Sequence, residues 1–103
     1  MANLRVKWTL PKTRESGKPL AVEDIKHVRI EVSADDGANY ALLGDFPPSV
    51  LETEAQDLDF GVYTFRGLVV DTANRVSQPL LAQWENADTT PPGALLSLDF
   101  DLL

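Results

Sequence analysis

Few residues in this chain have the types and spacing from which a catalytic or metal site is built. His27 is the only histidine, so one chain cannot complete a Ser-His-Asp triad or a site with several histidine ligands. Asp35, Asp36 and Asn39 offer oxygen atoms of the kind that Ca²⁺ binds. Their loop lacks the ligand count and the late bidentate glutamate of an EF-hand, so a hairpin turn is the favoured interpretation. We assign His27 to a solvated strand face.

Two acidic side chains, Asp57 and Asp59, form the next candidate pair. Paired carboxylates hydrolyse glycosidic bonds when they face each other across a cleft. Here they are adjacent turn residues on a small module, which leaves little room for a cleft. We therefore predict no catalytic residue and no enzymatic activity.

Two further groups of residues have the composition of a ligand site. The basic stretch 12–18 has charges for phosphate, but it has no aromatic residues between them and no glycine-rich cradle, so a solvated loop is predicted. Tyr40 and Trp84 are aromatic residues of the kind on which sugars stack. Packing at a core or an edge is the favoured role for each, and a glycan stays open as an alternative ligand.

The composition is that of one folded domain. The chain has 103 residues, of which 44% are apolar and 24% charged. It has no cysteine, which excludes disulfides and thiolate zinc sites, and we expect no metal or other cofactor. No apolar run approaches the roughly 20 residues of a membrane span, so membrane insertion is not expected. The first residues lack the layout of a secretory signal, so we expect synthesis in the cytoplasm without export by that route.

Charge is distributed unevenly along the chain. The net charge is −7, which argues against nucleic acid as a partner. Residues 1–29 hold seven Lys or Arg against three acids, whereas residues 30–103 hold two against thirteen. The two ends of the chain therefore attract each other.

The hydrophobic pattern has a period of two, which is typical of β-strands. From Leu4 to Leu10, apolar residues alternate with Arg5, Lys7 and Thr9, and Pro11 ends the run. Further strands are predicted at 25–33, 40–43, 49–54, 62–71 and 80–84, and no segment has a helical period. The pattern predicts an all-β sandwich of about seven strands.

The segment 57–71 is the most specific part of the sequence. Its residues Leu58, Gly61, Tyr63 and Phe65 resemble the start of strand F in bacterial fibronectin type III domains. The resemblance implies that the Tyr63 hydroxyl bonds back to upstream backbone, and that Leu58 and Gly61 supply an anchor and a turn. The first strand is similar to strand B of that family, which places Trp8 in the core. The stretch 32–43 resembles the hairpin between strands C and C′.

One strand of that family is not found in the sequence. Fibronectin type III domains begin with a strand A some ten or more residues before the tryptophan strand, and here three residues precede it. We therefore divide the chain into a sandwich at 1–85, a proline-rich linker at 86–93 and a strand-like tail at 94–103.

The tail alternates like a strand with one apolar face. Leu96, Leu98, Phe100 and Leu102 alternate with Ser97, Asp99 and Asp101. We expect it to supply the absent edge strand, with Asp99 and Asp101 across from Arg5 and Lys7. Pairing within one chain and exchange between copies both stay open. The alternatives are a tail ordered by crystal contacts and the opening strand of a further domain.

The resemblance implies a non-catalytic structural, assembly or adhesion module. Small versions of this family are frequent in the tail and capsid proteins of phages, so we expect a virion component whose partners are proteins, including further copies of itself. The alternative is a spacer or carbohydrate-binding module of a secreted multidomain hydrolase. Fold alone does not decide between these functions.

Overall fold

The computed structural model describes residues 1–103 and contains six strands and one short 3₁₀ turn. Their bounds, in chain order, are β1 Ala2–Lys7, η1 Val22–Asp24, β2 Ile25–Ser33, β3 Ala41–Phe46, β4 Glu52–Leu58, β5 Gly61–Asp71 and β6 Leu80–Asn86. No helix is long and apolar enough to span a membrane.

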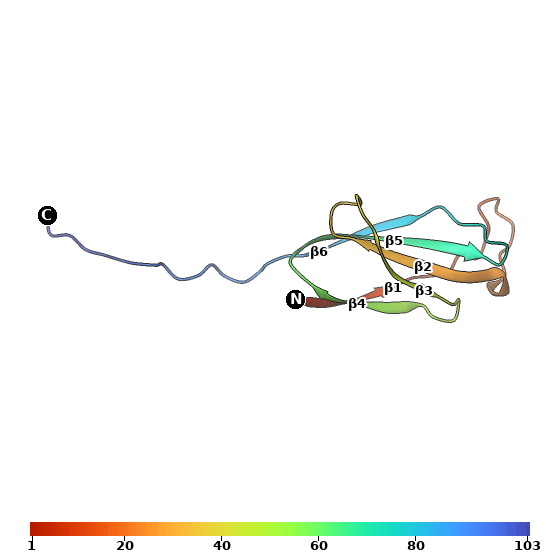
Figure 1. The fold of residues 1–103 in the computed structure, drawn as a ribbon, viewed down its shortest axis with the longest axis horizontal. Coiled ribbons are helices and arrows are strands. Elements are labelled where there is room, and N and C mark those ends of the chain that lie inside the picture. The colour runs from red at the N-terminus through yellow and green to blue at the C-terminus, as the bar shows by residue number, and fades with distance from the viewer.

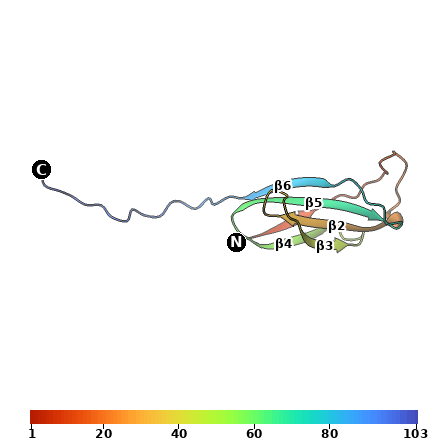
Figure 2. The same ribbon diagram turned by 45° about the horizontal axis from the view of Figure 1, so that its top comes forward.

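The strands form two antiparallel sheets of unequal size (Figures 1 and 2). The larger sheet has the order β3-β2-β5-β6, and the smaller sheet pairs only β1 with β4. The predicted all-β sandwich is confirmed. The strand count differs from the predicted seven, because no third strand lies beside β1.

The two longest strands form the centre of the larger sheet. β2 pairs with β5 so that Val28 lies opposite Val69, and Val32 lies opposite Phe65. These residues point toward the smaller sheet, where Phe65 packs with Ala55 and Leu58 of β4. Val28 and Ile30 are almost completely buried, at 3% and 4% exposure. The core is therefore centred on β2, β4 and β5.

The predicted strand boundaries hold within a few residues, with one larger shift. The strand expected at 49–54 begins at Glu52, because the Val50 N–H donates to the Pro47 carbonyl, at 2.9 Å, and closes a turn there. β4 then continues to Leu58, since its register with β1 runs from Lys7 opposite Glu52 to Ala2 opposite Leu58.

The tail lies away from the sandwich. Residues 87–103 form no strand, and the apolar side chains of the tail are 75–103% exposed from Leu96 to Leu102. Because of the tail the molecule measures 83 × 22 × 20 Å (Figure 1). Pairing of the predicted tail strand within its own chain is therefore not found, since no strand of this chain lies beside it.

Candidate functional site

The corner between β4 and β5 positions the end of the last strand. The Tyr63 hydroxyl donates to the Asp59 carbonyl at 3.0 Å, which is the backbone tie that the resemblance implies. The Asn86 side-chain amide donates to the carbonyls of Leu58, at 3.0 Å, and of Asp59, at 3.2 Å. Gly61 has a φ of +146°, a conformation that side chains rarely allow. The end of β6 is therefore fixed next to Leu58, beside the start of β1.

One edge of β1 has no partner strand. The Trp8 N–H donates to the Leu51 carbonyl, at 3.1 Å, on the side of β4. Because backbone groups alternate between the two edges of a strand, those of Arg5, Lys7 and Thr9 point to the open edge. Such an edge is a template for another strand.

The outer face of this edge carries positive charge. Arg5 lies opposite Glu54, and Lys7 lies opposite Glu52. Arg5 also makes a long ion pair with Glu52, with its Nε 3.9 Å from Oε2, and both side chains are more than half exposed. Exposed pairs of this kind contribute little to stability, so these cations can accept further carboxylates.

The inner side of the same edge opens onto an apolar groove with a volume of about 300 Å³. Its walls include Trp8 and Leu10 beyond β1, Val69 of β5, and Leu80 at the start of β6. Leu80 faces the smaller sheet, because it lies opposite Gly67, yet it is 78% exposed. The exposed side chain lies where a third strand of the smaller sheet would cover it.

Trp8 is held at one end of this groove. Its ring packs against Phe46 of β3 with centroids 5.2 Å apart, and its Nε1 is buried without an acceptor. Leu4 and Val6 of β1 are only half-buried, although they face the core. The inner face of β1 is thus covered from one side.

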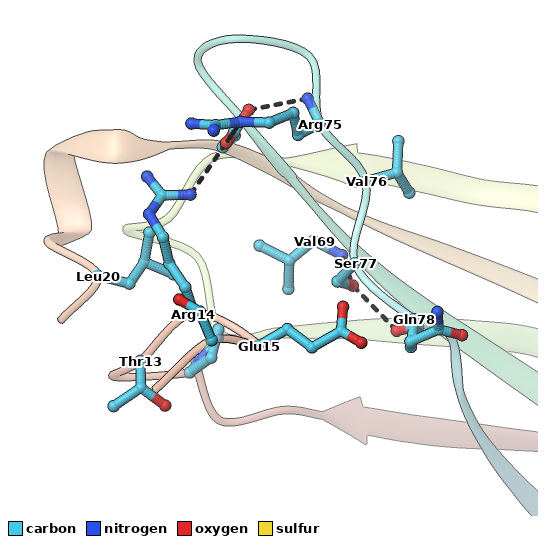
Figure 3. Close-up of a pocket in the computed structure, with 12 residues that line it drawn as sticks. Thr13, Arg14, Glu15, Leu20, Val69, Arg75, Val76, Ser77 and Gln78 are labelled. Atoms are coloured by element: carbon cyan, nitrogen blue, oxygen red, sulfur yellow. Dashed lines mark hydrogen bonds and ion pairs between the residues drawn. The ribbon is translucent and has the colours of Figure 1, made fainter. Parts of the chain in front are cut away.

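A second cavity, of about 460 Å³, lies beside the turn after β5 (Figure 3). The Asp71 carboxylate accepts hydrogen bonds from the guanidinium groups of Arg14, at 3.1 Å, and Arg75, at 2.7 Å. It also accepts the backbone N–H groups of Ala73 and Arg75. These donors, the Arg75 backbone first among them, lower the pKa of Asp71 to about 2.

The Asp71 cluster serves to hold two loops together. Arg14 belongs to the basic stretch 12–18, the predicted solvated loop, which is closed by backbone hydrogen bonds from Arg14 to Lys18 and from Gly17 to Arg14. The loop remains exposed except at Arg14. Since both oxygens of Asp71 accept hydrogen bonds from within the chain, the carboxylate is a structural clamp. Sequence reasoning missed it, although an Asp at the start of a turn commonly accepts a hydrogen bond from the backbone N–H two residues on, as Asp71 does from Ala73.

The loop with Asp35, Asp36 and Asn39, for which a hairpin turn was favoured over a calcium site, is a hydrogen-bonded turn. The Ser33 hydroxyl donates to Asp35, at 2.6 Å, and Asn39 donates to Asp35 from its backbone and its side chain. These bonds, that from Ser33 first, lower the pKa of Asp35 to about 2. The oxygens of Asp35 are therefore engaged within the hairpin, and no group of three acidic or histidine side chains in the chain has the spacing of a metal site.

The histidine is less exposed than predicted. The His27 side chain is 19% exposed, and its Nε2 lies 3.7 Å from an Asp45 oxygen without a hydrogen-bond partner. The prediction of a solvated residue is wrong, because His27 lies opposite Val70 of β5 and beside β3, which together cover it.

The remaining candidates lie apart from one another. Asp57 and Asp59 are exposed, but only Asp59 lies in the turn, because Asp57 belongs to the end of β4. The Arg66 guanidinium stacks over the Tyr40 ring, at 3.8 Å, whereas Trp84 stacks on Tyr63, with centroids 6.2 Å apart. Arg66 and Tyr63 point to opposite faces of β5, so Tyr40 and Trp84 form no common surface.

No protein-family model matches the chain, and no curated protein is significantly similar to it.

Proposed function

We propose that this chain is a fibronectin type III-like module that works through protein–protein contacts, without catalysis, as a structural component of a phage tail or capsid. The order β3-β2-β5-β6 corresponds to strands C′, C, F and G of that family, and β1 corresponds to strand B. The hydrogen bond from Tyr63 to the Asp59 carbonyl supports the same assignment.

The observation that carries the proposal is the open edge of β1 beside an apolar groove. Soluble sandwich proteins normally protect such an edge by covering or charging it. Here the outer face carries the charges of Arg5 and Lys7, but no strand covers the open edge, and most residues that line the groove beyond β1 are apolar. A surface of this kind is suited to take up a strand from another protein.

The arrangement of aromatic residues favours this function over carbohydrate binding. A sugar-binding platform needs exposed rings on one face, and Tyr40 and Trp84 are each engaged by a different neighbour on opposite faces of the larger sheet. The exposed apolar side chains of the tail are suited to pack against protein.

Proteomic analysis of purified particles from the phage whose genome encodes the chain tests the proposal. We expect the chain in many copies per particle, retained after high-salt washing. Absence from the particles, together with retardation of the chain in a gel that contains a polysaccharide, would instead establish the carbohydrate-binding alternative.

A further inference from the structure

The tail and the open edge of β1 are complementary surfaces of the same chain. The tail exposes Leu96, Leu98, Phe100 and Leu102 in alternation, and the groove beside β1 lacks an apolar cover. The side chains between them in the tail include Asp99 and Asp101, whereas the outer face of β1 carries Arg5 and Lys7. The apolar face of the tail therefore matches the groove, and the acidic face of the tail matches the basic outer face of β1.

We infer that residues 96–102 of one copy pair antiparallel with residues 4–10 of a second copy and complete its smaller sheet. This inference rests on the proposed function and names the partner as a second copy of this chain. In this register Leu102 lies opposite Leu4, and Leu96 lies opposite Leu10. Asp101 then faces Arg5, and Asp99 faces Lys7.

The backbone of β1 is compatible with this register. The open edge carries the N–H and C=O groups of Arg5, Lys7 and Thr9, since those of Trp8 point toward β4. Asp99 would therefore exchange backbone hydrogen bonds with Lys7. A slip by one residue would turn every apolar side chain of the tail to water, so the faces fix the register to within two residues.

The position at which the tail leaves the sandwich determines the direction of pairing. Asn86 ends β6 beside Leu58, and Leu58 lies opposite Ala2 at the start of β1. Figure 1 shows the tail running outward from that same end of the molecule. A tail that folded back on its own chain would therefore run parallel to β1. A tail that reached a copy placed ahead in the same orientation would enter at Leu10 and run antiparallel to β1.

Antiparallel pairing is the better of these two arrangements. β1 and β4 are antiparallel, and antiparallel ladders are slightly more stable per residue than parallel ones. When extended, at about 3.3 Å per residue, the segment from Ala87 to Ala94 spans up to about 26 Å. This length is available between one sandwich and the next. The antiparallel ladder and the length of this segment thus favour exchange of the tail between copies.

The direction also determines the symmetry of the assembly. A reciprocal two-fold dimer, with the starts of β1 facing each other, would place both tails parallel to β1. Antiparallel pairing requires a head-to-tail contact, which closes into a ring or continues as a filament. The inference therefore predicts assemblies larger than a dimer.

Cysteine pairs test the inference cleanly, because the natural chain has no cysteine. The full-length variant Lys7→Cys/Asp99→Cys should form disulfides between chains under mild oxidation, giving a ladder of trimers and larger species on a denaturing gel. Asp88→Cys, combined with Lys7→Cys, is the matched control in the linker, and we expect at least a fivefold lower yield of linked chains from it.

The variant Arg5→Cys/Ser97→Cys reports on the other direction, because parallel pairing of the same two segments would place these positions opposite each other, whereas antiparallel pairing places Ser97 four residues away. Efficient closed dimers from it, or an internal disulfide in either variant, would overturn the inference. So would a single-chain band from Lys7→Cys/Asp99→Cys at every protein concentration.

These outcomes are separable from the proposed function. A crosslinked ladder from a chain that is absent from phage particles would retain the strand exchange and reject the virion role. A chain that is abundant in particles but forms no ladder would retain the role and reject the exchange.

Discussion

The larger sheet and the edge of β1 differ in how completely each is covered. On the outer face of the larger sheet, Arg29 binds Asp45 through two hydrogen bonds, and Arg66 binds Glu31 in the same way. Its inner face includes almost completely buried apolar residues, among them Val28 and Ile30. On β1, by contrast, one edge is unpaired and the inward side chains are half-buried. The comparison shows that the larger sheet is satisfied by contacts within the chain over both faces, whereas β1 keeps an unpaired edge at which we propose that a partner strand binds.

The largest expected difference between the two regions is in the free energy of unfolding that is lost when an apolar side chain is truncated to alanine. Ile30→Ala should lower the free energy of unfolding by about 2–5 kcal/mol, because it removes a buried side chain and leaves a cavity. Leu80→Ala should change it by less than about 0.5 kcal/mol, because Leu80 is 78% exposed. Urea denaturation at a protein concentration low enough to keep the chain monomeric measures both. Equal losses would contradict the contrast in coverage.

The next effect concerns the clamp at Asp71. Its pKa is lowered from 3.8 to about 2 in the folded chain, so its contribution to stability is complete above about pH 5 and is lost progressively as the pH falls through about 2. Thermal melting between pH 7 and pH 2 should show this loss. Asp71→Asn should melt earlier at pH 7 and have a flatter profile below pH 4. Asp101→Asn, in the tail, is the control and should reproduce the profile of the natural chain.

A smaller effect is expected at the tyrosine corner. Tyr63→Phe removes the hydrogen bond to the Asp59 carbonyl and should lower the unfolding free energy by about 0.5–1.5 kcal/mol. The loss is limited, because the Asn86 amide still donates to that carbonyl. Calorimetry measures it, and Tyr40→Phe is the matched control, since the Tyr40 ring stays over Arg66. An equal loss in both variants would argue against a specific role for the corner.

The smallest effect is expected when an arginine is removed from an ion pair, and its cost in stability should differ between the two sheets. Arg66→Ala should cost about 1 kcal/mol, because it removes two hydrogen bonds to Glu31 and the stacking on Tyr40. Arg5→Ala should leave the stability of the monomer nearly unchanged, because its pair with Glu52 is long and exposed. Denaturation in low and high salt distinguishes the two, and a larger cost for Arg5→Ala would reverse the comparison.

Local patterns in the sequence were sufficient for most of the fold. The alternation from Ile25 to Ser33 and from Val62 to Asp71 predicted the two central strands, since burial on the inner face imposes a period of two. The turn at 34–39 followed from residues that tolerate positive φ, and Asp36 and Gly37 do adopt it. Such features depend on neighbours along the chain.

The features that sequence reasoning missed depend on contacts between distant segments. Arg14 reaches Asp71 across 57 positions, and His27 is covered by strands that follow it in the chain. Neither contact leaves a periodic pattern. The groove beside β1 was likewise invisible, because it is formed between residues 8–11 and residues of β2, β5 and β6 that are distant in the chain and each match an ordinary strand.

Sedimentation velocity over a range of concentrations tests the central claim most directly. The full chain should reach masses above two chains as its concentration rises, whereas the full-length variant Leu98→Asp/Phe100→Asp should stay at the mass of one chain. That variant leaves the sandwich intact, because the two side chains are 75% and 90% exposed. Equal masses for both proteins at every concentration would contradict the account, since the apolar face of the tail would then have no role in joining one copy to the next.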